Sequence, residues 1–529
     1  MQISMIQKIV MVLVLMLGVS VKAQQKKNLL FIITDQQRYD ALSIAGNQVL
    51  ETPNLDRLAK SGAYFKNAYT PCAVCGPARS SILTGMTVEN TGVNTNVKTY
   101  YYDKEPVMTS ITFDEILDKQ GYTCEYYGKW HAMSSHAEVY KNPKQVADNG
   151  KSMFGHGGQN HMYQDYLKEE YPRRSPGKGQ LIDDFTKRPY TPDPMDVNYG
   201  KSHKEVVAAQ KRFSQPNYHG KSAIPEEHTM TAYYAKKTMD AIERLKDGPF
   251  SITCSFHFPH APMIPSLPYY GMYPANEMTP PLSINDPMLN SPYSNANGRK
   301  SLTQFADVEK IKFMISNYYG LVKELDVWLG KIFEKLEEEG VADNTLIVFT
   351  SDHGEMLGAH GMREKNVFYE ESSHIPLILK DPKAIKKAKS FNQYVSTLDL
   401  FATVLDYLDA GEYASDGQSL RGIIENTDKD QGKYVVTEWD YRGDISPNYM
   451  IVKEGWKMFI PKTATSNVID VLYNLNKDPH EMNNLIGSNP DRFQYKEKVE
   501  ELRGDLLEWL AKNKSENYEA VKNRSIIKS

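Results

Sequence analysis

Two unbroken apolar runs, far apart in the chain, constrain the fold most. Residues 28–34 read Asn-Leu-Leu-Phe-Ile-Ile-Thr, and residues 345–350 read Thr-Leu-Ile-Val-Phe-Thr. Such runs are typical of strands that are buried on both faces, as in the parallel sheet of an α/β protein. Asp35 follows the first run and Asp352 follows the second. Because ligands gather at the carboxyl ends of strands in such sheets, we expect these two acidic turns to lie together.

The polar residues of the two turns form a candidate metal site. Gln36 follows Asp35, and His353 follows Asp352. An oxygen-rich ligand set suits calcium or magnesium better than zinc. The alternative is that the two carboxylates are unrelated loop caps, and the turns alone do not decide between the two interpretations.

Residues 72–85 form a candidate reactive loop that leads into a helix. Cys72 and Cys75 precede Pro77, and a helix-like run then stops at Gly85. Proline suits the first position of a helix, and glycine suits the left-handed residue after its last turn. Unpaired amides at the helix start would face Cys75 and lower its thiol pKa. Taken alone, the stretch also allows a redox Cys-x-x-Cys pair, half of a zinc site or a buried thiol.

Length, charge and cysteine content narrow the class of protein. A chain of 529 residues is too long for one small core and predicts one large domain with a smaller one. With 62 Lys and Arg against 66 Asp and Glu, the net charge of −4 gives no sign of a nucleic-acid-binding surface. Four cysteines are too few for a disulfide scaffold.

Residues 1–23 are predicted to be a cleaved signal peptide. Lys8 precedes an apolar run over residues 9–21, and the cleavage site falls near Ala23. The apolar run is shorter than the roughly 20 residues that a membrane span needs. No cysteine that could carry a lipid follows the cleavage site. We therefore expect a secreted or periplasmic protein without a stable membrane anchor.

The rest of the chain divides into a core, an insert and a C-terminal unit. Apolar residues at helical spacing predict core helices over 233–245 and 311–339. Residues 133–227 are polar and rich in Tyr, Lys, Gly and Pro, which indicates a surface insert of the kind that often forms substrate walls. Short alternating strands in the last part predict a small α+β unit. We place the catalytic domain at 24–420 and the C-terminal subdomain at 421–529.

The pattern Cys-x-Pro-x-Arg at residues 75–79, followed by Ser-Ile-Leu-Thr-Gly, resembles the signature of the type I sulfatases in the alkaline phosphatase superfamily. The resemblance runs from residue 28 almost to the end of the chain. It implies an α/β fold with a large mixed, mostly parallel sheet sandwiched by helices and a small C-terminal α+β subdomain. The other matching blocks are Thr-Pro-Asn-Leu-Asp at 52–56, Gly-Lys-x-His at 128–131, Pro-His-x-Pro at 259–262 and Leu-Tyr-x-Leu-x-x-Asp-Pro-x-Glu-x-x-Asn-Leu at 472–485.

The resemblance also implies the nucleophile and the metal ligands. In this family a maturation enzyme oxidises the signature cysteine to Cα-formylglycine, whose hydrated aldehyde attacks sulfur. By position this residue is Cys75 and not Cys72. Arg79 and the metal would hold the nucleophile deprotonated, with Ca²⁺ as the expected ion and Mg²⁺ as the alternative. The implied ligands are Asp35, Gln36, Asp352, His353 and the modified Cys75.

Lysines and histidines that match the family receive roles in the same way. Lys129 and Lys365 would offset charge on the sulfuryl oxygens. His131 is the implied base that helps to expel sulfate. A histidine would give a proton to the leaving oxygen, and we favour His260 over His257 for this role.

Two positions depart from the commonest sulfatase pattern, which has two aspartates at the first turn and Asp-Asn at the second. Gln36 and His353 resemble the variant of some sulfatases and of phosphonate monoester hydrolases. A phosphonate monoester or phosphodiester hydrolase is therefore the alternative activity. A non-catalytic glycan-binding protein on the same fold is less favoured, because every expected catalytic position is filled. We expect a sulfated carbohydrate as the substrate, and the sequence leaves its identity and the oligomeric state open.

Overall fold

The computed structural model describes most of the chain. The described residues are 26–96, 108–132, 139–141, 158–209, 218–293, 307–385, 387–428, 431–439, 446–463 and 465–527. The predicted signal peptide lies outside them. Among the residues that are described, no helix is long and apolar enough to cross a membrane.

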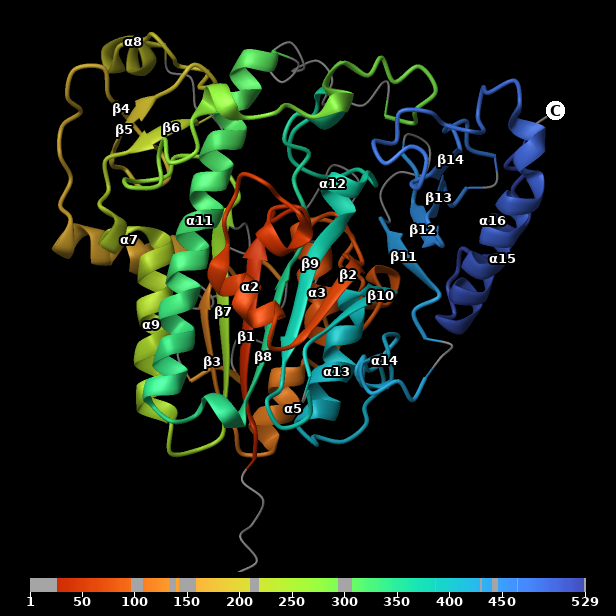
Figure 1. Cartoon of the computed structure of the whole chain (residues 1–529), viewed down its shortest axis with the longest axis horizontal. Helices are drawn as coiled ribbons and strands as arrows, with labels where there is room; N and C mark the ends of the chain where they lie inside the picture. Colours follow the sequence, from red (N-terminus) through yellow and green to blue (C-terminus); the bar gives the residue numbers. More distant parts are fainter. Residues whose placement is uncertain are drawn as a thin grey trace, which may run out of the picture.

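A seven-stranded sheet with the order β10-β2-β9-β8-β1-β7-β3 forms the centre of the molecule (Figure 1). Neighbours run parallel except at β9, which is antiparallel to both β8 and β2. The predicted mixed, mostly parallel sheet is confirmed. Its strands are β1 (Asn28–Asp35), β2 (Ala63–Tyr69), β3 (Thr123–Gly128), β7 (Phe250–Pro259), β8 (Thr345–Ser351), β9 (His374–Lys380) and β10 (Lys389–Ser396).

Both faces of this sheet are buried under helices, as the apolar runs predict. In β1, Leu30 and Ile32 belong to one hydrophobic cluster, whereas Leu29, Phe31 and Ile33 belong to another. The first cluster includes side chains from α2 (Pro53–Ala59), α9 (Met230–Leu245) and α11 (Val308–Glu338), and the second includes side chains from α3 (Cys75–Thr84), α5 (Phe113–Lys119) and α13 (Leu400–Tyr407). The predicted helices over 233–245 and 311–339 correspond to α9 and α11.

Part of the predicted insert forms a small unit of its own beside α9 and α11 (Figure 1). A three-stranded antiparallel sheet, β4-β5-β6, is its centre. Its elements are α7 (Gly158–Glu170), β4 (Leu181–Ile182), β5 (Pro189–Pro192), α8 (His203–Ala208) and β6 (Gly220–Ser222). The remainder of the predicted insert lies outside the described residues.

The C-terminal subdomain is an antiparallel sheet, β11-β12-β13-β14, with two helices packed on it, which confirms the predicted α+β unit. The subdomain joins the catalytic domain where Glu438 N–H donates to Pro71 C=O over 2.9 Å. The boundary at residues 420 and 421 stays a prediction. The elements of the subdomain sheet and its helices are β11 (Tyr434–Glu438), β12 (Tyr449–Lys453), β13 (Trp456–Ile460), β14 (Val471–Asn474), α15 (Lys496–Lys512) and α16 (Tyr518–Lys522). Elsewhere in the chain, three short helices lie in connecting segments: α4 (Val88–Thr91), α12 (Glu370–Ser373) and α14 (Arg421–Ile424).

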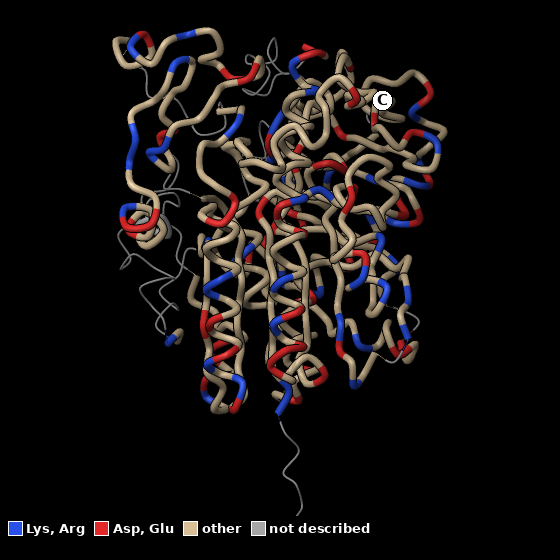
Figure 2. Tube along the Cα trace, turned by 60° about the vertical axis from the view of Figure 1, so that its left-hand side comes forward, with Lys and Arg blue, Asp and Glu red and all other residues tan. Residues whose placement is uncertain are grey.

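Charged residues of both signs are interspersed along the chain (Figure 2). Many of them are buried, among them Glu324 on α11, which accepts a hydrogen bond from the Thr229 hydroxyl. Burial raises the pKa of Glu324 to about 8. Since a glutamate in the unfolded chain has a pKa of about 4.3, folding takes up a proton between these two values, and the stability falls as the pH rises through this window.

We expect Glu324→Gln to raise the melting temperature by several degrees at pH 9 and by much less at pH 5, because glutamine removes the ionisation but keeps a hydrogen-bonding group. Thermal unfolding at the two pH values measures the effect. Glu334→Gln, at an exposed position of the same helix, is the matched control. Equal shifts at pH 5 and pH 9 would contradict the assignment.

Candidate active site

The carboxyl ends of β1 and β8 lie side by side and bring the two acidic turns together. Thr34 pairs with Ser351 in the sheet, and Asp352 N–H donates to Thr34 C=O over 3.2 Å. Gln36 N–H donates to Asp352 Oδ1 over 3.1 Å, with Gln36 in the left-handed region at φ 69°. Such a conformation is uncommon for a residue other than glycine and is typical of a functional turn. The expected meeting of the two turns is confirmed.

Cys75, the first residue of helix α3, lies next to the two acidic turns. The helix begins at Cys75, so Pro77 is its third residue and not its first as predicted. Proline is tolerated there because the amides of the first turn have no partner within the helix. Gly85 ends the helix with φ 68°, and its N–H donates to Ser81 C=O over 2.8 Å, as predicted. The reactive residue therefore stands at the helix N-terminus.

A buried group of four possible metal donors forms at this point. One donor atom from each of four side chains lies within 4.8 Å of all the others. The residues are Asp35, Cys75, Asp352 and His353. Asp35 Oδ1 is buried without a hydrogen-bond partner in the described part of the chain. An unpartnered buried carboxylate oxygen is costly, and a bound cation would satisfy it, so the residues present fit a metal ion.

Gln36 lies at the edge of this group with its side chain fixed from both ends. Its Oε1 accepts a hydrogen bond from Lys365 Nζ over 2.8 Å, and its Nε2 donates to Glu355. An amide oxygen has two lone pairs, so the bond from Lys365 leaves one for a metal. Ligation by Gln36 stays a prediction. Glu355, which follows His353 by two residues, is a site residue that the sequence reasoning left without a role.

Cations surround the two aspartates. Lys129 Nζ pairs with Asp35 Oδ2 and lies 3.6 Å from Cys75 Sγ. Arg79 Nε donates to Asp352 Oδ2 over 2.7 Å, and its Nη2 lies 3.4 Å from Asp35 Oδ2. Burial raises the pKa of the Asp35 carboxyl, but Lys129 and the other cations outweigh burial and hold this pKa well below its usual range.

Cations also lower the pKa of the side chain at the nucleophile position. Burial and the Asp35 carboxylate raise the pKa of the Cys75 thiol. Lys129 and Lys365 outweigh both and place this pKa well below its usual range. Cys75 Sγ lies 3.0 Å from His353 Nε2. Position 75 is thus built to stabilise negative charge, and the cations provide this effect. That helix amides add to it stays a prediction, and the Gly76 N–H is donated to Asn96 Oδ1.

The predicted segment Gly128-Lys129-Trp130-His131 is held against β7. Gly128 has φ 107°, and a side chain there would begin only 1.8 Å from the Ser255 carbonyl oxygen, so glycine is required. His131 lies beside Cys75, and burial lowers the pKa of His131. A neutral imidazole at this position can accept a proton.

The two histidines at the end of β7, His257 within the strand and His260 directly after it, have different surroundings. His260 Nδ1 donates to the Ala261 carbonyl over 2.7 Å, which leaves Nε2 as the acceptor 3.1 Å from Lys365 Nζ. Burial and the Lys365 ammonium hold the pKa of His260 well below its usual range. His257 stacks on Phe185, with the ring centres 4.9 Å apart. Phe185 belongs to the insert, and no local signal in the sequence marks it as part of the site.

Comparison with known proteins assigns this site to a family. A family model described as "Sulfatase" matches residues 27–410. The chain belongs to the sulfatase family. Its members are sulfuric ester hydrolases, and the group of residues around Cys75 is the candidate active site of this sulfatase. A second model, described as the C-terminal part of N-sulphoglucosamine sulphohydrolase, matches residues 358–512.

Individual relatives cover nearly the whole sulfatase chain. The arylsulfatase of Clostridium perfringens is 28% identical over 499 residues, 92% of this chain and 94% of that one. The N-acetylglucosamine-6-O-sulfatase of Bacteroides thetaiotaomicron is 27% identical over 526 residues, 93% of this chain and 88% of that one. The crystal structure of the phosphonate monoester hydrolase of Agrobacterium radiobacter has a TM-score of 0.70 at 23% identity and covers 91% of this chain and 96% of that one. The last similarity shows the alkaline phosphatase-like fold.

Proposed function

We propose that this sulfatase hydrolyses a sulfate ester on a sulfated carbohydrate, with a formylglycine made from Cys75 and a divalent metal ion. The observation that carries the proposal is the position of Cys75, at the start of α3 and within 4.8 Å of three potential metal donors. Similarity to an N-acetylglucosamine-6-O-sulfatase supports a carbohydrate substrate. The proposal includes a maturation enzyme as a partner.

Asp35, Asp352 and His353 would hold the ion, with Gln36 as a further ligand. The oxygen-rich set favours Ca²⁺, with Mg²⁺ as the alternative. When bound, the metal would supply positive charge to the nucleophile and to the sulfuryl group. The hydrated aldehyde of formylglycine would supply two hydroxyls, one for attack on sulfur and one for the release of sulfate.

Other side chains of the site would take the remaining catalytic roles. Lys129 and Lys365 carry fixed charge opposite the sulfuryl oxygens, which is the electrostatic contribution that usually dominates such sites. Arg79 orients Asp352 and keeps the nucleophile position electropositive. Neutral His131, beside residue 75, accepts the proton when sulfate is expelled. His260 Nε2 accepts a hydrogen bond from the Lys365 ammonium, so Lys365 can pass a proton to this nitrogen, and His260 then gives that proton to the leaving oxygen.

A screen of sulfated mono- and oligosaccharides, with protein produced together with a maturation enzyme, tests the proposed activity. We expect the wild-type enzyme to release sulfate from at least one of these sugars and the Cys75→Ala variant to release none.

The second candidate function is phosphonate monoester hydrolysis at the same site, which Gln36 and the fold similarity to a phosphonate monoester hydrolase favour. Faster turnover of an aryl phosphonate monoester than of every sulfate ester would replace the first proposal with the second.

The proposed location is outside the cytoplasm. It rests on the signal-peptide pattern of residues 1–23. Amino-terminal sequencing of protein from the natural host tests it, and an intact N-terminus would contradict cleavage near Ala23.

The proton donor can be identified through the leaving group. We expect His260→Ala to slow hydrolysis of a sugar sulfate by about 10²–10⁴-fold. An activated aryl sulfate should lose much less, because its phenolate leaves without a proton. Steady-state kinetics on both substrates measure the difference.

His257→Ala is the matched control, since it removes a neighbouring imidazole that stacks on Phe185. It should slow both substrates by similar factors. The opposite pattern would assign the proton to His257. If neither variant discriminates between the substrates, the proton donor lies elsewhere and Lys365 becomes the next candidate.

A further inference from the structure

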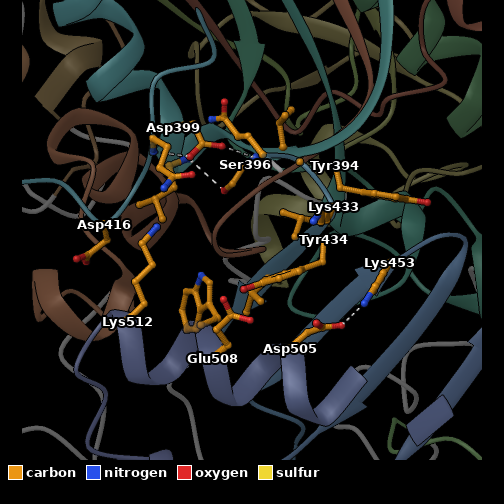
Figure 3. Close-up of a pocket in the computed structure, with 18 of the residues that line it drawn as sticks. Tyr394, Ser396, Asp399, Asp416, Lys433, Tyr434, Lys453, Asp505, Glu508 and Lys512 are labelled. Carbon is orange, nitrogen blue, oxygen red and sulfur yellow. Dashed lines mark hydrogen bonds and ion pairs between the residues drawn. The ribbon is translucent and has the colours of Figure 1, made fainter. Parts of the chain in front are cut away.

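A cavity lies between the catalytic domain and the C-terminal subdomain (Figure 3). Its volume is about 660 Å³, within the roughly 300–1,000 Å³ of small-molecule sites. One wall is β10 with the turn that follows it, and the other is β11 with α15. None of the residues assigned above to the catalytic site lines this cavity.

Helix α15 presents two different faces. Val499, Leu502, Leu506 and Leu510 are buried in the core of the subdomain. Asp505, Glu508, Trp509 and Lys512 line the cavity at positions i, i+3, i+4 and i+7, which places them on one face. The side chains of Glu508 and Lys512 extend from the helix toward the cavity (Figure 3). The second face is thus aromatic and charged: Trp509 is half-buried and packs in part against the core of the subdomain, whereas Glu508 and Lys512 are exposed.

Aromatic side chains line the cavity on both walls. Trp509 comes from α15, Tyr434 from β11 and Tyr394 from β10, and all three are half-buried. Half-buried Trp and Tyr rings offer a rigid apolar face with a polar tip. The apolar C–H face of a sugar ring stacks on such a surface, while its hydroxyls reach polar groups around it.

The charged groups of the lining bear on the class of ligand that the cavity could take. Asp505 is already paired with Lys453 over 2.7 Å. Within the described residues, the side chains of Glu508 and Lys512 make no hydrogen bond or ion pair. One is an acceptor and the other a donor, and their charges cancel. The whole lining contains five carboxylates and three lysines, and this excess of negative charge disfavours a sulfate or phosphate group. The charged lining residues are Asp399, Asp416, Asp428, Asp505, Glu508, Lys433, Lys453 and Lys512.

We propose that this cavity is a second, non-catalytic carbohydrate-binding site that takes an uncharged sugar residue. The ring stacks on Trp509 or Tyr434, Glu508 accepts from sugar hydroxyls, and Lys512 donates to them. The proposal involves no catalytic step, so it stands or falls independently of the function proposed above. An uncharged ligand also separates this cavity from the catalytic site, which is lined by cations.

The test is a titration of the full-length enzyme with lactose, cellobiose and N,N′-diacetylchitobiose, followed by ligand-observed NMR or calorimetry. We expect at least one disaccharide to bind with a Kd in the millimolar range. Trp509→Ala should weaken this binding at least tenfold and leave hydrolysis of an activated aryl sulfate unchanged. Phe493→Ala, which removes an exposed aromatic side chain outside the cavity, is the matched control and should bind like the wild type.

Glu508→Gln and Lys512→Met provide a second test at exposed positions in case Trp509→Ala folds poorly. Each should weaken binding of the same disaccharide severalfold. The proposal is overturned if none of the three sugars binds, if binding survives all three substitutions, or if inorganic sulfate competes with the sugar, because sulfate competition would place the sugar in the catalytic site.

Discussion

Replacing Cys75 by alanine is expected to reduce sulfate ester hydrolysis by at least about 10⁴-fold, the scale on which loss of a covalent nucleophile acts. Cys75 is where helix α3 starts, Lys129 Nζ lies 3.6 Å away, and His353 Nε2 lies 3.0 Å away. Kinetics on the preferred sulfate ester measure the loss.

Cys72→Ala is the matched control, because the second thiol lies in the same loop but in an apolar cluster with Val74 and Val88. We expect this variant to keep activity within a few-fold of the wild type. Peptide mass spectrometry of the active enzyme should show an aldehyde at position 75 and an unmodified thiol at position 72. An active enzyme with a free thiol at position 75 would overturn the formylglycine mechanism.

The surroundings of the two thiols also bear on the alternatives that the sequence left open for residues 72–85. A redox pair would need both cysteines in comparable, reactive surroundings. Only Cys75 belongs to the group of donors from the two acidic turns. A zinc site built on the Cys-x-x-Cys pair would use both thiolates, but Cys72 lies outside the group of donors. The donor set of the structure instead suits a hard cation.

The centre of the fold could be predicted because a strand buried on both faces must be apolar throughout. This requirement marks β1 and β8 in the sequence without ambiguity, and it places Asp35 and Asp352 at one edge of the sheet. The antiparallel strand β9 between β8 and β2 could not be predicted. Its apolar residues read like those of a parallel strand, and its direction depends on the connection through α12.

Contacts between distant segments could not be predicted from the sequence for a related reason. Phe185 reaches His257 from the insert, and the position of a surface segment depends on packing instead of local pattern. A buried network gives a second example: Lys457 lies 2.7 Å from Glu370 and 3.0 Å from Glu481. Isolated charges in the sequence predict solvent exposure, and only the fold brings these three together.

The Asp35 and Asp352 carboxylates are expected to matter more than any other ligand of the metal. Asp35→Asn or Asp352→Asn should lower activity by at least about 10³-fold, since each removes a full negative charge opposite a dication in a dry site. Gln36→Ala removes a neutral amide and should have a smaller effect. Metal content by elemental analysis, together with activity, should fall in the two Asn variants and be partly retained in Gln36→Ala.

The ion pairs of the two aspartates give a further reason why their substitution should cost more activity than Gln36→Ala. Asp35 also pairs with Lys129, and Asp352 pairs with Arg79, so each Asn variant leaves a buried cation less well paired and makes the site more positive. Both changes disfavour a metal ion, whereas Gln36→Ala leaves the two ion pairs intact. Chelation followed by dialysis should abolish activity, and added Ca²⁺ or Mg²⁺ should restore it. Activity that survives chelation would show that these residues hold no catalytic metal and that the cations alone offset the charge of the sulfuryl group.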